Sequence, residues 1–300
     1  METWVAITIS AAFFQNIRSA LQKYLKDELG TTGATFVRFG YGFPFALGFL
    51  GILYLFFGYP LPSMNLAFGG WILLAALTQI LAQILLINIF SYRNFAVGTA
   101  YSRTEPAQAA LFGLLFLADT ISWPTMIAIG ISVAGVMLIS LARTEFTAAS
   151  LISSLLTRSV AIGLCSGTFF GIAAVSYRGA ALSLNGPNFL MQGCVTLCAA
   201  ITFQTLIMSI YMCIQSRKEL VAACRAWKPA LAVGFVGASA SFGWFTAMTL
   251  EKAAIVKAVA QVEIIFTFIA SVFFFRETIN RLEVIGCISI VGGILLILLA

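Results

Sequence analysis

The sequence predicts an all-α membrane protein with about ten transmembrane helices arranged as two inverted five-helix repeats. Two observations lead to this fold class: an extreme apolar composition and an internal duplication. Hydrophobic residues make up 61% of the 300 residues and charged residues only 9%, whereas soluble domains carry about 25% charged residues. A spanning helix needs about 20 mostly apolar residues, so most of this chain is expected to lie within the bilayer.

Apolar stretches separated by turn residues define the expected spans. The turns contain signals such as Pro60, Pro62 and the pair Gly186-Pro187. The N-terminus lacks a basic segment, so the first apolar stretch is expected to remain as a helix and not to be cleaved. The ten expected spans cover residues 3–22, 32–57, 70–90, 95–117, 121–142, 159–180, 187–214, 229–250, 253–275 and 280–300.

The duplication is visible as an ungapped alignment between two distant segments. Residues 91–142 align with residues 249–300 at a constant offset, and Gly135 falls opposite Gly293. Acids are rare in this chain, so aligned acids are the stronger sign of a repeat. The matched acids are Glu105 with Glu263 and Asp119 with Glu277.

The alignment divides the chain into two halves and a linker. We expect the first repeat over residues 1–142, a polar linker over 143–158 and the second repeat over 159–300. An odd number of spans in each half places the second half upside down relative to the first. This inverted-repeat plan is typical of secondary transporters, whose binding site lies near the bilayer midplane between the halves.

Loop charges predict an orientation. Of the 17 cations, 11 fall in loops on one side of the membrane and only Arg178 and Lys252 fall on the other. Cytoplasmic loops are enriched in Lys and Arg, so both termini are expected outside the cytoplasm. The cations on the enriched side are Lys23, Lys26, Arg93, Arg143, Arg158, Arg217, Lys218, Arg225, Lys228, Arg276 and Arg281.

Charged residues inside two expected spans are the main functional candidates. An ion at mid-bilayer costs roughly 2.5–3.5 kcal/mol, so such residues face the bundle interior or a wet cavity. On an unbroken ninth helix, Lys257 and Gln261 share one face and Glu263 points elsewhere. Arg103 and Glu105 diverge in the same way on the fourth helix. These residues are expected to line or gate a solute path, or alternatively to form ion pairs that tie the repeats together.

Further polar residues lie on other expected spans. Gln15 and Arg18 share one face of the first span, although Arg18 could instead extend to the headgroups. Gln79 and Gln83 share a face of the third span, where hydrogen bonding between helices is an alternative role. Arg38, near the end of the second span, is expected to anchor that span at the interface.

Aromatic and proline residues complete the set of candidates. Tyr41, Tyr101 and Trp244 lie mid-span beside small or polar neighbours, so they are candidates for stacking on a planar solute. Pro44 and Pro106 lie inside spans, where each removes a helical hydrogen bond and is expected to kink the helix.

The composition also argues against several classes of function. The chain has no histidine, and its six cysteines show no metal-site spacing, so we expect no metal, no cofactor and no enzymatic activity. The dispersed cations argue against nucleic-acid binding, and a monomer or homodimer is expected. Without histidine, glutamate is the expected proton carrier.

The sequence resembles the drug/metabolite transporter superfamily, in its EamA-like branch. The resemblance rests on the two-halved plan, on acids at the fourth–fifth (Asp119) and ninth–tenth (Glu277) connections, and on Gly286 and Gly292-Gly293 in the last span. The segments Met1–Val5 and Gln22–Lys26 are similar to bacterial riboflavin-transporter members of that branch.

The resemblance implies a secondary transporter of the cell inner membrane that moves a small organic solute by alternating access. A planar vitamin such as riboflavin is the leading candidate solute, and export of an amino acid or related metabolite is the alternative. A membrane-embedded enzyme or a lipid or assembly factor is the alternative of another class.

Overall fold

The computed structural model describes residues 2–89, 100–142, 158–186, 188–273 and 280–299. Within these ranges every regular element beyond an isolated bridge between Ser63 and Asn185 is a helix, as the sequence predicts. The expected linker falls almost wholly outside the described residues, as does Glu277. Six helical segments are long and apolar enough to cross a membrane: Thr3–Phe56, Leu66–Ile89, Arg158–Ser183, Phe189–Gln215, Trp227–Leu250 and Arg281–Leu299.

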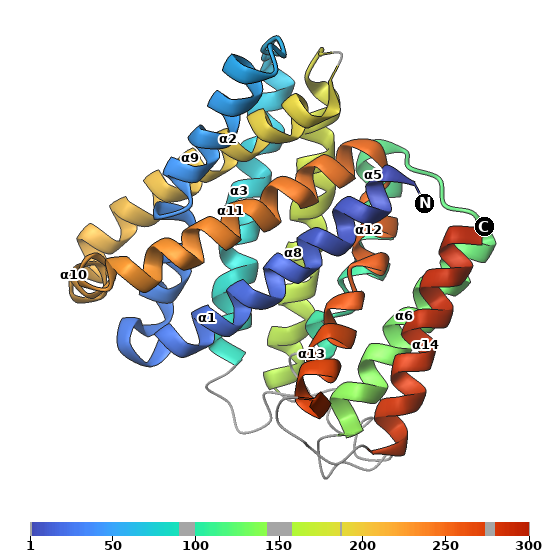
Figure 1. Ribbon diagram of the computed structural model, residues 1–300. Coiled ribbons are helices and arrows are strands. Elements are labelled where there is room, and N and C mark those ends of the chain that lie inside the picture. The colour runs from blue at the N-terminus through green and yellow to red at the C-terminus, as the bar shows by residue number, and fades with distance from the viewer. Residues whose placement is uncertain (1, 90–99, 143–157, 187, 274–279, 300) are drawn as a thin grey trace. The chain divides into compact units, whose positions relative to one another are not determined.

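The helices fall into two compact units, each built from both halves of the chain (Figure 1). Unit 1 contains residues 1–80 and 176–251, and unit 2 contains residues 81–175 and 252–300. Unit 1 holds α1 (Thr3–Gly40), α2 (Phe43–Gly51), the π-helix η1 (Ile52–Phe56), α9 (Phe189–Gln215), α10 (Arg217–Arg225) and α11 (Trp227–Leu250). Unit 2 holds α5 (Glu105–Leu117), α6 (Trp123–Ala142), α12 (Ala253–Val259), α13 (Val262–Phe273) and α14 (Arg281–Leu299). The unit boundaries fall inside α3 (Leu66–Ile89) and α8 (Arg158–Ser183).

The most extensive helix–helix interface of unit 1 joins α1 and α11, which run side by side in Figure 1. Gly243 lies against Ala11, and Gly237 lies against Arg18, so the two helices are antiparallel. A Cβ atom added at Gly243 would lie only 2.8 Å from the Ala11 Cβ. Small residues permit this close approach, which gives van der Waals contact where lipid supplies no hydrophobic drive between helices.

The first helix continues beyond the expected end at residue 22 and bends sharply at Gly30. Gly30 has φ +70° and ψ −178°, outside the helical region, and this positive φ favours glycine. The chain then resumes as a helix up to Gly40. Glu219 of α10 accepts a hydrogen bond from the Gly33 backbone N–H at 2.8 Å. The carboxylate thereby satisfies one of the donors left open at the start of the new helical segment.

The expected second span is itself interrupted at Tyr41-Gly42, between α1 and α2. Pro44 lies in the first turn of α2, where its missing N–H costs no hydrogen bond. The expectation that Pro44 removes a helical hydrogen bond and kinks the span is therefore wrong: the span is interrupted before Pro44, at Tyr41-Gly42, and the proline starts the next helix.

Unit 2 contains an equally close helix pair, α6 and α14 (Figure 1). A Cβ atom added at Gly135 would lie 2.7 Å from the Gly286 carbonyl oxygen, and one added at Gly293 would collide with Ser132. Gly135 and Gly293, which the repeat alignment pairs, therefore both serve the same interface.

Candidate functional site

Two helices of unit 2 break at nearly the same position of the repeat. Helical residues 100–102 are followed by a turn at Arg103-Thr104, after which α5 begins at Glu105. Likewise α12 ends at Val259, a turn follows at Ala260-Gln261, and α13 begins at Val262. The expected fourth and ninth spans are thus discontinuous in corresponding places.

A glutamate lies in the first turn of the helix that follows each break. Glu105 is the first residue of α5, and Glu263 lies in the first turn of α13. The positive end of the helix dipole stabilises a carboxylate in the first turn. Pro106 also lies in the first turn of α5, where no intrahelical donor is lost. The break therefore creates two equivalent positions suited to an acid.

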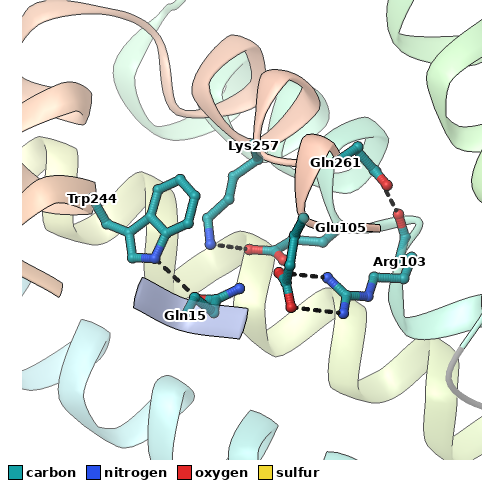
Figure 2. A network of polar contacts seen from close by, with 7 residues as sticks. Gln15, Arg103, Glu105, Trp244, Lys257 and Gln261 are labelled. Carbon is teal, nitrogen blue, oxygen red and sulfur yellow. Dashed lines mark hydrogen bonds and ion pairs between the residues drawn. The ribbon is translucent and has the colours of Figure 1, made fainter. Parts of the chain in front are cut away.

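The two acids bind cations across the repeats (Figure 2). Arg103 Nη1 and Nη2 donate to the two Glu263 oxygens at 3.1 and 3.3 Å, a bidentate pair. Lys257 Nζ lies 2.8 Å from Glu105 Oε1. Gln261 Nε2 donates to the Arg103 carbonyl oxygen at 3.2 Å, which ties one break to the other. The five site candidates expected on the fourth and ninth spans thus all take part in ion pairs or hydrogen bonds between the two repeats.

This network corrects the expectation of two separate polar directions on each helix. That expectation assumed unbroken helices, in which Glu105 and Arg103 diverge. The turns at the breaks reorient the following helical segments, so each glutamate meets a cation of the other repeat. Of the two alternatives, the ion pairs are therefore present.

The four charged side chains are enclosed to different degrees. The Glu263 side chain is 4% exposed and Arg103 is 33% exposed, whereas Lys257 and Glu105 have 14% and 17% exposure. An acid occupies the equivalent position in both repeats, but its cation does not. Lys257 aligns with Thr99, which lies outside the described residues, and Arg103 aligns with Gln261. The repeats therefore share the acids and supply the counter-charges differently.

In unit 1, Gln15 and Trp244 form a separate polar contact. Trp244 is buried, and its indole N–H donates to Gln15 Oε1 at 3.0 Å across the α1–α11 interface (Figure 2). The hydrogen bond fixes the ring plane of Trp244.

Gln79 belongs to a second polar cluster of unit 1. Its Oε1 accepts hydrogen bonds from Tyr177 Oη and from Gln204 Nε2, both at 2.7 Å. Gln204 also donates to Tyr177 Oη at 3.0 Å. Hydrogen bonding between helices thus accounts for Gln79. Gln83, four residues later on α3, is buried as well.

The remaining sequence-predicted residues have diverse surroundings. Arg18 is buried at 5% exposure, so it faces the protein interior. Arg38 is likewise buried, at 4%, which contradicts the expected role of an interfacial anchor. Tyr41 donates from its hydroxyl to the Ala223 carbonyl oxygen at 3.0 Å, and Tyr101 packs in an apolar cluster with Val160. The structure thus assigns packing or hydrogen-bonding contacts to both tyrosines.

Sequence reasoning missed two members of the Gln79 cluster, Tyr177 and Gln204. Gln204 carries the same signal as Gln79, an isolated amide within an apolar span. Tyr177 stands beside Arg178 near the end of its span and resembles an interfacial residue in the sequence. Its burial at 1% exposure follows from its contact with Phe245, whose ring centroid lies 4.0 Å away.

Comparisons with known proteins give a family and a fold. The model of the EamA-like transporter family matches residues 2–141 and, a second time, residues 157–299. No curated protein matches the chain. One solved crystal structure matches with a TM-score of 0.70 and 14% identity, covering 99% of this chain and 96% of its own, which establishes a shared fold.

Proposed function

Because this chain belongs to the EamA-like transporter family, a family of multi-pass membrane transporters of small solutes, we propose that it is a secondary transporter of the inner membrane. It moves a small organic solute by alternating access between two inverted five-helix repeats, residues 1–142 and 159–300. The double match of the family model, to residues 2–141 and 157–299, supports these repeats.

The paired helix breaks of unit 2 are the observation that carries this proposal. Transporters commonly form their sites from discontinuous helices in corresponding positions of the two halves. Here both breaks carry an acid in the first turn of the following helix, and each acid binds a cation of the other repeat. Rocking one repeat against the other would exchange these ion pairs, so the pairs are suited to gate a solute path.

Glutamate is the residue that we assign to proton coupling. The chain has no histidine, and the ordinary alternative carriers in membrane transporters are Asp and Glu. Protonation of Glu105 or Glu263 removes the charge that holds Lys257 or Arg103. A proton would therefore release the partner cation and favour the rearranged state.

The leading candidate solute is a planar vitamin such as riboflavin, with an amino acid or related metabolite as the alternative. The ring of Trp244, held by Gln15, supports a planar solute, because an oriented aromatic face favours stacking.

Counterflow in proteoliposomes tests the proposal. Purified protein loaded with unlabelled riboflavin or unlabelled amino acids should accumulate the corresponding labelled solute. Glu105→Gln and Glu263→Gln should abolish accumulation while the proteins elute as monodisperse species. Glu28→Gln, which removes an exposed acid of α1, is the matched control and should retain transport.

Two results would withdraw the proposal. Full transport by any folded Glu105→Gln or Glu263→Gln protein would mean that the ion pairs are only structural. Absence of counterflow for every tested solute, in protein that remains folded, would argue for the membrane-enzyme or assembly-factor alternatives.

A further inference from the structure

The short helix α10 joins α9 and α11, two helices that are long and apolar enough to cross a membrane. It begins at Arg217, with only Ser216 between it and α9, and it ends at Arg225, with only Ala226 between it and α11. In Figure 1, α10 is seen nearly end-on while α9 and α11 are seen from the side, so it runs across the ends of both. A helix in this position lies where the hydrocarbon meets the headgroups.

One face of α10 is fixed to other elements of unit 1. Glu219 accepts the hydrogen bond from the Gly33 N–H, and the Ala223 carbonyl oxygen accepts one from the Tyr41 hydroxyl at 3.0 Å. Glu219 and Ala223 are four residues apart and therefore share a face. The one acid in the sequence of α10 is thus directed at α1.

The other face of α10 is exposed and cationic. Arg217, Val221 and Arg225 follow one another at four-residue intervals and therefore share a face, which Lys218 borders. These four side chains are exposed, as is Lys228 just beyond the helix. Basic residues around an apolar one on a helix at the membrane surface are typical of segments that bind anionic lipids.

Aromatic residues flank α10 on both sides. Trp227 follows it and is 51% exposed, and Lys228 Nζ lies 5.6 Å from the centre of the indole ring. Tyr211, near the end of α9, is also exposed. Trp and Tyr are enriched where membranes meet water. The cations of α10 therefore stand at the level of the lipid phosphates.

We propose that the exposed face of α10 binds anionic phospholipids through Arg217, Lys218, Arg225 and Lys228. Guanidinium groups bind phosphate through paired, charge-assisted hydrogen bonds, while Val221 and Trp227 supply apolar contact below the headgroups. A soluble acidic partner would match the charges, but it would not explain the apolar and aromatic residues at the ends of two spans. The site does not depend on which solute is transported.

Quenching of Trp227 fluorescence in the full chain tests the site with brominated lipids as the probe. Proteoliposomes of phosphatidylcholine receive equal small fractions of either dibrominated phosphatidylglycerol or dibrominated phosphatidylcholine. The Trp227→Phe variant measures the signal of the other tryptophans, which is subtracted. The anionic lipid should reach half-quenching at a fraction at least about fivefold lower, the effect of one surface cation.

Two double variants separate charge from side-chain shape. Arg217→Gln with Arg225→Gln should raise the half-quenching fraction of the anionic lipid at least about fivefold. Arg217→Lys with Arg225→Lys should retain most of the preference, because both charges remain. Arg158→Gln with Arg281→Gln is the matched control, since it removes two exposed cations of unit 2 and the same total charge. The control should leave the preference unchanged.

Three results would overturn the proposal. Equal quenching by the two lipids in the wild-type protein would exclude a preference for the anionic lipid and leave the cationic face to a soluble acidic partner. An equal loss of preference in the α10 glutamine variant and in the control would mean that the total charge attracts the lipid without a site. A loss in the lysine variant as large as that in the glutamine variant would contradict recognition by charge.

Discussion

Lys257 Nζ lies 2.8 Å from Glu105 Oε1, so a cation of the second sequence repeat neutralises an acid of the first. In the second ion pair, Arg103 of the first repeat neutralises Glu263 of the second. Both acids stand at helix starts that follow a break, and this shared placement explains why an acid recurs there. The effects of these ion pairs on stability and on transport can be separated by experiment.

Glu105→Gln should destabilise the protein, and the double change Glu105→Gln with Lys257→Gln should recover part of the loss. The single change leaves Lys257 enclosed without its acid. Both partners keep 14–17% exposure, so the cost should lie between about 0.2–1 kcal/mol for exposed pairs and about 3–5 kcal/mol for buried pairs. Thermal unfolding of the three variants measures it. Equal stability of single and double variants would contradict the pairing.

Glu263→Gln should cost more stability than Glu105→Gln. Glu263 is 4% exposed and accepts two hydrogen bonds from Arg103, so its loss leaves a fork-shaped donor without its acceptor. Side-by-side unfolding curves provide the comparison. The charge swap, Arg103→Glu together with Glu263→Arg, should be more stable than either single change. If it is not, neighbouring groups and not the pair alone determine which charge each position can hold.

Gly234→Ala should destabilise the protein by about 1–3 kcal/mol, the usual cost of overpacking. A Cβ atom there would collide with the Tyr41 carbonyl and lie 2.8 Å from the Gly42 nitrogen, which are backbone atoms that cannot move aside. Gly237→Ala, three residues along α11, is the matched control. Its Cβ atom would meet side-chain atoms at 3.4 Å or more, so stability should be unchanged or slightly raised. Equal losses would refute the close approach of α11 to the Tyr41-Gly42 turn.

Both termini are expected outside the cytoplasm, because 11 loop cations lie on one predicted side and two on the other. A C-terminal alkaline phosphatase fusion should be active, and a C-terminal green fluorescent protein fusion should be dark. As a control, lysines added near residue 61 would increase the number of loop cations on the cation-poor side. This change should weaken the phosphatase signal. The reverse pair of signals would invert the predicted topology.

The apolar runs predicted the helical fold well, but they did not predict where helices break. Pro106 indicated an irregularity beside Glu105, and α5 indeed starts there. No proline or glycine marks the turn at Ala260-Gln261. That turn is stabilised by tertiary contacts, including the Gln261 hydrogen bond to the Arg103 carbonyl, which no local propensity encodes.

Polar residues were harder to assign than helices. Their positions in the chain showed that they lie within apolar spans, but not which side faces a partner. Arg38 illustrates the difficulty: its place in the second span suggested a lipid interface, and packing against α11 encloses it instead. The Gln79 cluster depends on three helices that are distant in sequence, so only the folded chain brings it together.

The hydrogen bond from the Gly33 N–H to Glu219 has a practical consequence for mapping this protein by truncation. A reporter fused anywhere between residues 40 and 218 truncates the chain before Glu219, so the Gly33 N–H has no carboxylate to bind. The helical bend at Gly30 would then lack this hydrogen bond. Such fusions would report the topology of a truncated chain and not that of the folded protein. Short epitopes inserted into the 300-residue chain keep the hydrogen bond between Gly33 and Glu219 and are the better choice for accessibility labelling.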